Sequence, residues 1–176
     1  MAGLTAGAMA VVAFLAYQAS AHVPATLGTP PVTSPSARPS GSPAETHRDP
    51  LAVPALSGEG TRVVYSLGER RVWLVPSKGQ HPPTFPVMPS TVSPAPGTYT
   101  VTSRTDRIQG SDGVPIEHVV RFAKVDNVTI GFSAATDGSM QNPDISKKTG
   151  GVRMKRADGN AMWTFAGLGT KVVVVP

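Results

Sequence analysis

The sequence predicts a mainly β domain made of two packed sheets, with one short helix near the C-terminus. Short runs of β-branched and aromatic residues alternate with turn residues beyond position 60. The 176 residues include 18 Pro and 18 Gly, and such frequent chain breakers argue against a helical bundle. Only one segment places apolar residues at helical spacing. Many short strands and a single helix predict a β-sandwich or a mixed two-sheet domain.

The folded part is expected to open with a β-hairpin. Residues 62–67 (RVVYSL) and 71–75 (RVWLV) flank the short turn GER. A further short strand is expected at residues 84–88. The stiff turn PAPG then precedes a strand at residues 98–103 (TYTVTS), where β-branched residues dominate.

The second half predicts another hairpin, a helix and a last strand. Residues 117–124 (EHVVRFAK) and 127–134 (NVTIGFSA) are expected to pair as antiparallel strands. Asp158 is expected to cap a helix that ends before Gly167. The apolar stripe of this helix consists of Ala161, Met162 and Phe165. The final run, 171–175 (KVVVV), is continuously apolar and predicts a strand inside a sheet.

The N-terminus predicts export. No residue from Ala2 to Ala21 is charged, and residues 8–17 (AMAVVAFLAY) form a compact apolar run. Residues 19–21 (ASA) have the small-x-small form of a signal-peptidase site. Residues 1–21 are therefore expected to be a signal peptide or an uncleaved membrane anchor, since about 20 apolar residues can span a bilayer.

A linker is expected to separate the leader from the domain. Seven of the 29 residues at 22–50 are Pro, and most of the others are small or polar. Such a segment has too few apolar side chains to offset the entropy of ordering, so residues 22–50 predict a disordered, Pro-rich linker. The domain then spans residues 51–176.

Conventional active-site motifs are missing from the sequence. The chain has no Cys, which excludes disulfides, thiolate metal sites and cysteine nucleophiles. The four His are scattered without metal-ligand spacing, and we interpret His118 as a structural residue of its strand. No P-loop, dinucleotide fingerprint or Gly-x-Ser-x-Gly elbow is present. We therefore expect neither a metal nor a cofactor.

One segment stands out by its charge. Residues 147–156 (KKTGGVRMKR) carry five positive side chains and no acid. A solvated basic loop is the simplest interpretation. The pair Gly150 and Gly151, however, allows close backbone approach, so free N–H groups beside Arg153 could bind a carboxylate. No aromatic residue interrupts the run, and nucleic acid is therefore not expected as a partner.

Together these segments resemble the L,D-transpeptidase (YkuD) catalytic domain of bacterial cell-wall enzymes, over about residues 61–175. VVYSLGERRVWLV is similar to the first two strands of that family, and FPVMPSTVSPAPGTYTV to its strand, Thr-Pro-x-Gly turn and strand, with PAPG at the turn. The most specific part is GGVRMKRADGNAMWTFAGLGTKVVVV. The family has Ser-His-Gly-Cys there, then a hydrophobic residue, Arg, Met or Leu, a helix with an acidic residue, and a Gly-Thr-x-Val strand. The positions that fit this pattern are Gly150, Val152, Arg153, Met154, Asp158, Gly169, Thr170 and Val172.

The resemblance implies that the catalytic residues have been lost in register. Gly151 occupies the position of the nucleophilic cysteine, and Lys148 and Thr149 replace the serine and histidine before the glycine. The base histidine of the family closes an Ile-Gly-x-His-Gly strand. This chain reads IGFSA at 130–134, so Ser133 occupies the histidine position, while the spacing to the second motif is retained.

The resemblance favours an extracytoplasmic protein, secreted or membrane-anchored, whose domain binds the cell wall without catalysis. Peptidoglycan stem peptides or other anionic wall polymers would be the partners, with membrane contact through residues 1–21 if these are not cleaved. The ligand groove would consist of Ser133, Lys148, Thr149, Gly150, Gly151 and Arg153.

Two alternatives remain open from the sequence. The first is an active transpeptidase or peptidase that uses Ser133 or Thr149 as nucleophile. Its base would be Lys147, Lys148 or His118, because an unactivated hydroxyl needs one. The second is a scaffold module that binds another envelope protein.

Overall fold

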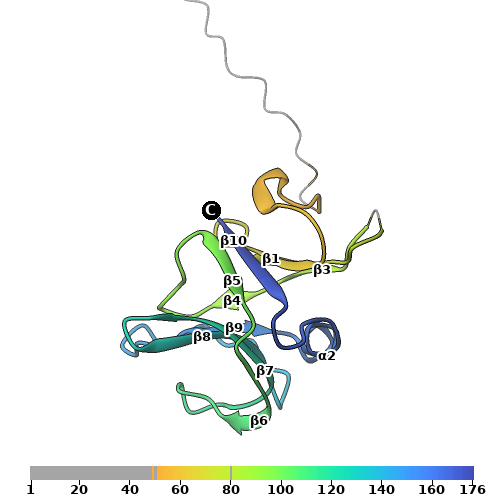
Figure 1. The fold of residues 1–176 in the computed structure, drawn as a ribbon. Coiled ribbons are helices and arrows are strands. Elements are labelled where there is room, and N and C mark those ends of the chain that lie inside the picture. Colours follow the sequence, from red (N-terminus) through yellow and green to blue (C-terminus); the bar gives the residue numbers. More distant parts are fainter. Residues whose placement is uncertain (1–48, 50, 80) are drawn as a thin grey trace, which may run out of the picture. The chain divides into compact units, whose positions relative to one another are not determined.

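A computed structural model describes residue 49, residues 51–79 and residues 81–176 (Figure 1). The expected signal peptide or anchor (1–21) and almost all of the expected linker (22–50) lie outside the described residues. None of the helices formed by the described residues combines the length and the apolar character that a membrane span requires.

The described residues form two five-stranded sheets, as the sequence predicts. The strand order in sheet A is β3 (Thr84–Pro86), β2 (Arg71–Val75), β1 (Arg62–Ser66), β10 (Lys171–Val175) and β5 (Gly97–Thr100). The order in sheet B is β4 (Met88–Pro89), β9 (Gly151–Met154), β8 (Val128–Ala135), β7 (Pro115–Val125) and β6 (Ser103–Gln109). The short 3₁₀ helix η1 (Ala55–Ser57) precedes β1, and the α-helix α2 (Arg156–Phe165) follows β9. The prediction of a mainly β, two-sheet domain is confirmed.

Both predicted hairpins form. β1 pairs antiparallel with β2, and β7 pairs antiparallel with β8. The turn between β7 and β8 consists of Asp126 and Asn127, whose φ angles are 46° and 67°. Positive φ at both central residues matches the right-handed twist of the flanking strands. β10 lies between β1 and β5, so its prediction as an interior strand is also confirmed.

Two predicted strands turn out to cross between the sheets. Residues 84–88 contribute β3 to sheet A and β4 to sheet B. Residues 98–103 likewise end β5 in sheet A and begin β6 in sheet B. The buried Val87 and Val101 lie at these crossings and enter the core, which explains why each segment looks like one continuous strand in the sequence.

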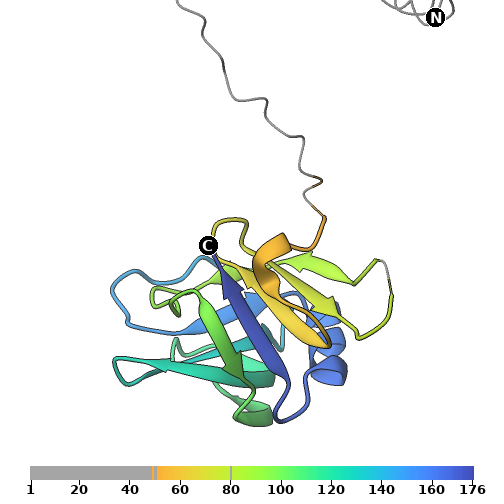
Figure 2. The ribbon, with the colours of Figure 1, turned by 45° about the horizontal axis from the view of Figure 1, so that its top comes forward.

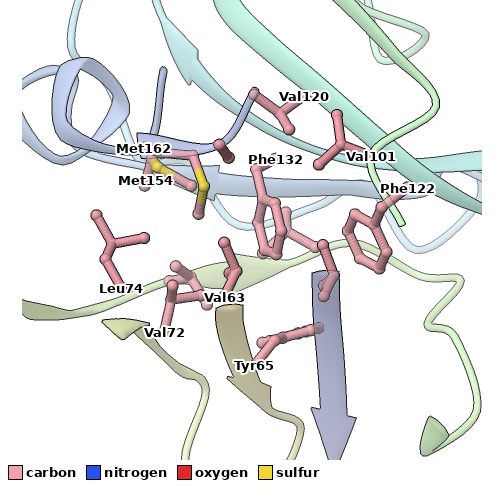
Figure 3. Packing of buried hydrophobic residues seen from close by; sticks show 14 of the residues in the cluster. Val63, Tyr65, Val72, Leu74, Val101, Val120, Phe122, Phe132, Met154 and Met162 are labelled. Carbon is pink, nitrogen blue, oxygen red and sulfur yellow. The ribbon is translucent and has the colours of Figure 1, made fainter. Parts of the chain in front are cut away.

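The core lies between the two sheets (Figure 3). Val63 and Tyr65 of β1 face Phe132 of β8 and Met154 of β9, and all four are fully buried. The rings of Phe122 and Phe132 stack with their centroids 4.8 Å apart. Burying each of these larger apolar side chains contributes about 1.5–3 kcal/mol, so this layer is the main source of stability.

The outer face of sheet A is covered by the segment that leads into the domain. Val53 packs on the apolar cluster that Trp73 forms with valines of β1 and β10. The indole Nε1 of Trp73 donates to the Leu51 carbonyl at 2.9 Å. Figure 2 shows this orange segment, with η1, lying against sheet A.

Helix α2 begins differently from the sequence prediction. Lys155 occupies the N-cap without a side-chain cap, and Asp158 lies inside the first turn, so the predicted cap is wrong. The helix is held instead by Arg156, whose Nε donates to Glu117 Oε1 of β7 at 2.5 Å. Glu117 is buried and also accepts from Arg107 Nη2 at 3.4 Å. The hydrogen bond from Arg156 lowers the pKa of the Glu117 carboxyl, which therefore stays ionised.

Candidate functional site

An open cleft lies on the outer face of sheet B. Its empty volume is about 750 Å³, counting the solvent space at its mouth. The lining comes from β4 and Ser90, the turn before β7, the loop at 139–144, and the ends of β8 and β9. The floor includes Ile116, Ser133, Gly151 and Arg153.

The register of β8 and β9 explains which side chains reach the cleft. The two strands run parallel, with Gly131 opposite Gly151 and Ser133 opposite Arg153. Alternate residues of a strand face opposite sides, and the residues between these belong to the core, such as Phe132 and Val152. Gly151, Ser133 and Arg153 therefore all face outward and lie on neighbouring strands.

The structure brings together four of the six predicted groove residues. Ser133, Thr149, Gly151 and Arg153 all line the cleft. The other two, Lys148 and Gly150, are not among its lining residues. Lys148 is exposed, and Gly150 is buried beneath the cleft floor.

The two adjacent glycines have opposite surroundings. A Cβ added to Gly150 would lie 2.4 Å from the Thr129 carbonyl oxygen and 2.5 Å from Cδ1 of Ile130. A Cβ added to Gly151 would meet no atom within 4 Å. Gly150 is therefore required by packing, whereas Gly151 leaves open space at the cleft floor.

Several hydrogen bonds join the segment at 90–92 to the segment at 149–151. The Ser90 N–H donates to the Gly151 carbonyl at 2.9 Å, and the Val92 N–H donates to the Thr149 carbonyl at 3.0 Å. The Thr149 N–H in turn donates to Oγ1 of Thr91 at 3.1 Å, and the hydroxyls of Ser90 and Thr149 are hydrogen-bonded to each other. Sequence reasoning did not single out Ser90 and Thr91, because they read as ordinary residues of a Pro-rich loop.

Arg153 is already paired within the cleft. Its Nη2 lies 2.7 Å from Oδ2 of Asp112, a residue of the turn between β6 and β7. Only 12% of the Arg153 side chain is exposed. Lys147 lies beside this pair, since its Nζ donates to the Asp112 carbonyl at 3.3 Å and is 3.8 Å from Oδ2 of Asp144. Hydrogen bonds from Ser146 lower the pKa of Asp144, so this rim carboxylate is also ionised.

In the described part of the chain, the cleft hydroxyls make no hydrogen bond to the side chain of a candidate base. The Thr149 hydroxyl is bonded to that of Ser90, and the Ser133 hydroxyl makes no hydrogen bond to a described residue. Of the bases considered above, Lys147 is engaged by Asp112 and Asp144, and Lys148 is exposed. His118 belongs to a different environment: its ring lies 5.4 Å from that of Trp163 in α2. A hydroxyl needs an adjacent base to become a nucleophile, and no hydrogen bond between the described residues joins Ser133 or Thr149 to such a group.

A resident metal would also lack ligands among the described residues. They contain no group of three or more His, Cys, Asp or Glu side chains that could hold a metal ion. The cleft lining offers hydroxyl, amide and backbone groups for hydrogen bonding, beside the ion pair of Arg153 with Asp112.

Comparison with known proteins identifies the fold. No family model matches the sequence, and no curated protein matches it. An L,D-transpeptidase from Stackebrandtia nassauensis has a similar structure, with a TM-score of 0.54 at 14% identity over 75% of this chain and 62% of that chain. The domain has the L,D-transpeptidase fold. This chain thus matches less than two thirds of that protein.

Two further solved structures agree with this assignment. An L,D-transpeptidase from Mycobacterium smegmatis matches with a TM-score of 0.50 at 13% identity, over 68% of this chain and 60% of that chain. An L,D-transpeptidase solved in complex with imipenem also gives a TM-score of 0.50, at 14% identity over 67% of this chain and 60% of that chain. At such identities the likeness establishes the fold alone.

Proposed function

We propose that this chain is an exported cell-envelope protein whose domain binds peptidoglycan stem peptides or other wall polymers without reacting with them. Export would depend on residues 1–21, and residues 22–50 would hold the domain (51–176) away from the membrane. If the leader is not cleaved, it would keep the protein in the membrane, facing the wall.

The observation that carries the proposal is the open floor at Gly151. Gly151 is the first residue of β9 and lines a cleft that also contains Ser133 and Arg153. Yet Gly151 has no side chain, and no described base contacts the hydroxyls of Ser133 or Thr149. A retained cleft without a nucleophile–base pair supports binding in preference to turnover.

The lining of the cleft suits a peptide. Gln141 and Asn142 can both donate to and accept from amide groups, and the largely buried Ser133 also lines the cleft with a hydroxyl. Met88 and Ile116 provide apolar surface beside these groups. Mostly uncharged polar groups set among apolar ones are typical of a site that orients its ligand by hydrogen bonds.

Retention on purified cell wall tests this proposal. The full chain should be retained, and Gly151→Phe should lose retention because the ring would fill the cleft from a position with free space. Gly167→Phe is the matched control, since a Cβ at Gly167 also meets no atom within 4 Å and Gly167 does not line the cleft. Equal retention of the wild type and Gly151→Phe would refute binding through this cleft.

Two alternative functions have distinct readouts. A hydroxyl enzyme would lose stem-peptide turnover in Ser133→Ala or Thr149→Val. The free Ser133 hydroxyl beside Arg153 is the feature that favours this alternative. A scaffold for an envelope protein would lose its crosslinked partner in the Lys147/Lys148 double variant while still binding the wall.

A further inference from the structure

We infer that Asp112 is the specificity-determining residue of the cleft. Its carboxylate forms an ion pair with the Arg153 guanidinium, as a ligand carboxylate would. The cleft therefore selects ligands whose contacting group is uncharged over ligands that present a carboxylate. This inference deepens the proposed function and rests on it for the identity of the natural ligand, but its chemistry can be tested with small probes.

The contact between Asp112 and Arg153 joins two parts of the chain that are 41 residues apart. Oδ2 of Asp112 accepts from Nη2 of Arg153 at 2.7 Å, the short distance of a charge-assisted hydrogen bond. Both side chains line the cleft, and that of Arg153 is largely buried. Arg153 is the one cationic side chain among the described lining residues, so Asp112 neutralises the group that would attract an acid.

The pairing leaves the guanidinium only partly used. Nε of Arg153 is buried and has no hydrogen-bond partner among the described residues. Arginine binds a free carboxylate best through two parallel N–H groups, which Asp112 does not achieve. A ligand carboxylate would therefore find a better geometry than Asp112 provides, once Asp112 no longer held the site.

The turn that carries Asp112 is built to present it. Oδ1 of Asp112 accepts from the Val114 N–H at 3.1 Å, and the Gly110 N–H donates to the Val114 carbonyl at 2.8 Å. A Cβ on Gly110 would lie 2.4 Å from Oδ1 of Asp112, so only glycine allows this approach. Gly113 has a φ of 91°, which also favours glycine. The carboxylate is thus held beside Arg153 before any ligand arrives.

Preorganisation gives Asp112 an advantage over a dissolved acid. To bind Arg153, a ligand carboxylate must displace the charge-assisted bond from Asp112. It would then place its own negative charge next to that of Asp112. An uncharged amide meets neither obstacle, because it can bond to the hydroxyl and amide groups elsewhere in the lining. The selectivity of the cleft then depends on one carboxylate in the turn between β6 and β7.

Asp112→Asn removes this charge while preserving the turn. An Asn Oδ1 can still accept from the Val114 N–H, whereas its amide group cannot accept from Arg153. Asp112→Ser is a second variant whose hydroxyl can also accept in the turn. Asp126→Asn is the matched control, since it removes one negative charge from the exposed turn between β7 and β8 and tolerates positive φ there.

The experiment titrates N-acetylglycine and N-acetylglycinamide, which differ only in carboxylate against carboxamide, into each full-length variant. Binding is followed by NMR at the Arg153 Nε–H signal. In Asp112→Asn, the affinity for the acid should rise about tenfold or more, as expected for a hydrogen bond to a charged group, while that for the amide stays unchanged. Adding Arg153→Gln should remove the gain, and Asp126→Asn should behave as wild type.

Equal acid affinity in wild type and in both Asp112 variants overturns the inference, and so does a failure of the folded variants to bind either probe. These outcomes are independent of wall retention. If the Asp112 variants gain affinity for N-acetylglycine but the wild type is not retained on cell wall, the proposed wall ligand is refuted and the role of Asp112 stands. If the wild type is retained on cell wall but the Asp112 variants gain no affinity for N-acetylglycine, the role of Asp112 is refuted and the proposed function stands.

Discussion

Gly150 and Gly151 are neighbours in the chain and look alike in the sequence, yet an added side chain would meet different surroundings at each. An extra carbon on Gly150 would collide with the Thr129 carbonyl and with Ile130. On Gly151 it would project into the empty cleft. The first glycine is thus a packing requirement of sheet B, and the second leaves open space in the cleft.

The two sides of β9 differ in the same way: one side packs in the core, and the other lines the cleft. The Gly150 carbonyl accepts from the Gly131 N–H at 3.2 Å, which ties β9 to β8. The side of β9 that faces the core is filled by Val152 and Met154. The opposite side carries Arg153, and Gly151 beside it has no side chain. The L,D-transpeptidase fold therefore depends on the side of β9 that faces the core, and it does not by itself determine what the cleft does.

The largest effect is expected from Gly150→Ala. The added methyl group overlaps a backbone oxygen that cannot rotate away, so the free energy of unfolding should fall by about 3 kcal/mol. Chemical denaturation measures this change. Gly167→Ala is the control, because its methyl group meets no atom within 4 Å. A Gly150→Ala protein as stable as the control would contradict the packing role.

A smaller loss is expected from Glu117→Gln, on the face of sheet B that contacts α2. The substitution removes the ion pairs of residue 117 with Arg156 and Arg107. Because water can hydrate both arginines, the free energy of unfolding should fall by only about 1 kcal/mol. Wall retention at neutral pH should not change, since Glu117 does not line the cleft. Loss of retention in a folded Glu117→Gln protein would show that stability and binding are not separable in this way.

The ion pair of Glu117 with Arg156 predicts that the stability of the fold depends on pH. The pKa of Glu117 is lowered from its ordinary value of 4.5, mainly by the hydrogen bond from Arg156. The ionised carboxylate therefore stabilises the fold above pH 4.5, and this contribution is lost as the pH falls through the lower pKa of the folded state. Unfolding curves of wild type and Glu117→Gln should converge below pH 4.5; a constant difference down to lower pH would contradict the ion pair.

Restoring the missing side chains sharpens the comparison further. Gly151→Cys should place a thiol in the cleft that reacts with an alkylating reagent. Adding Ser133→His should speed this reaction about tenfold at neutral pH, since a neighbouring imidazolium lowers the pKa of a thiol by about one unit. Equal alkylation rates for the single and double variants would mean that the side chains at 133 and 151 do not meet in the cleft.

The smallest effect is expected from Gly151→Ala. Its methyl group has free space and φ at this position is not positive, so stability should change by no more than about 0.5 kcal/mol. The thermal unfolding midpoint is sufficient to check this. A loss as large as that of Gly150→Ala would remove the distinction between the two glycines.

Much of sheet A could be predicted from the sequence because its strands are short, apolar and bounded by turn residues. The β1–β2 hairpin and the interior strand β10 are examples. The residues at 84–88 and 98–103 were wrongly predicted as single strands, since alternation along a segment does not reveal that the chain changes sheets. β9 was missed because its four residues lie in a basic, glycine-containing run that reads as a loop.

The site shows the same division. Ser133, Gly151 and Arg153 were identified because their spacing resembles a family motif, and the structure places them together on the cleft floor. Asp112 was missed because it lies in a Gly-Ser-Asp-Gly turn, where aspartate is common for local reasons. Only the three-dimensional pairing of that turn with β9 shows that its carboxylate faces Arg153. No sequence signal at Asp112 could have indicated this contact.

The most direct measurement is intact mass spectrometry of the full chain after incubation with cell-wall fragments and with imipenem. If the cleft binds without reacting, as proposed from Gly151 and from the hydroxyls of Ser133 and Thr149, the mass of the wild type should stay unchanged. The Gly151→Cys/Ser133→His variant, treated in parallel, tests whether the restored side chains react. A covalent adduct on the wild type, mapped to Ser133 or Thr149, would contradict a cleft that binds without reacting.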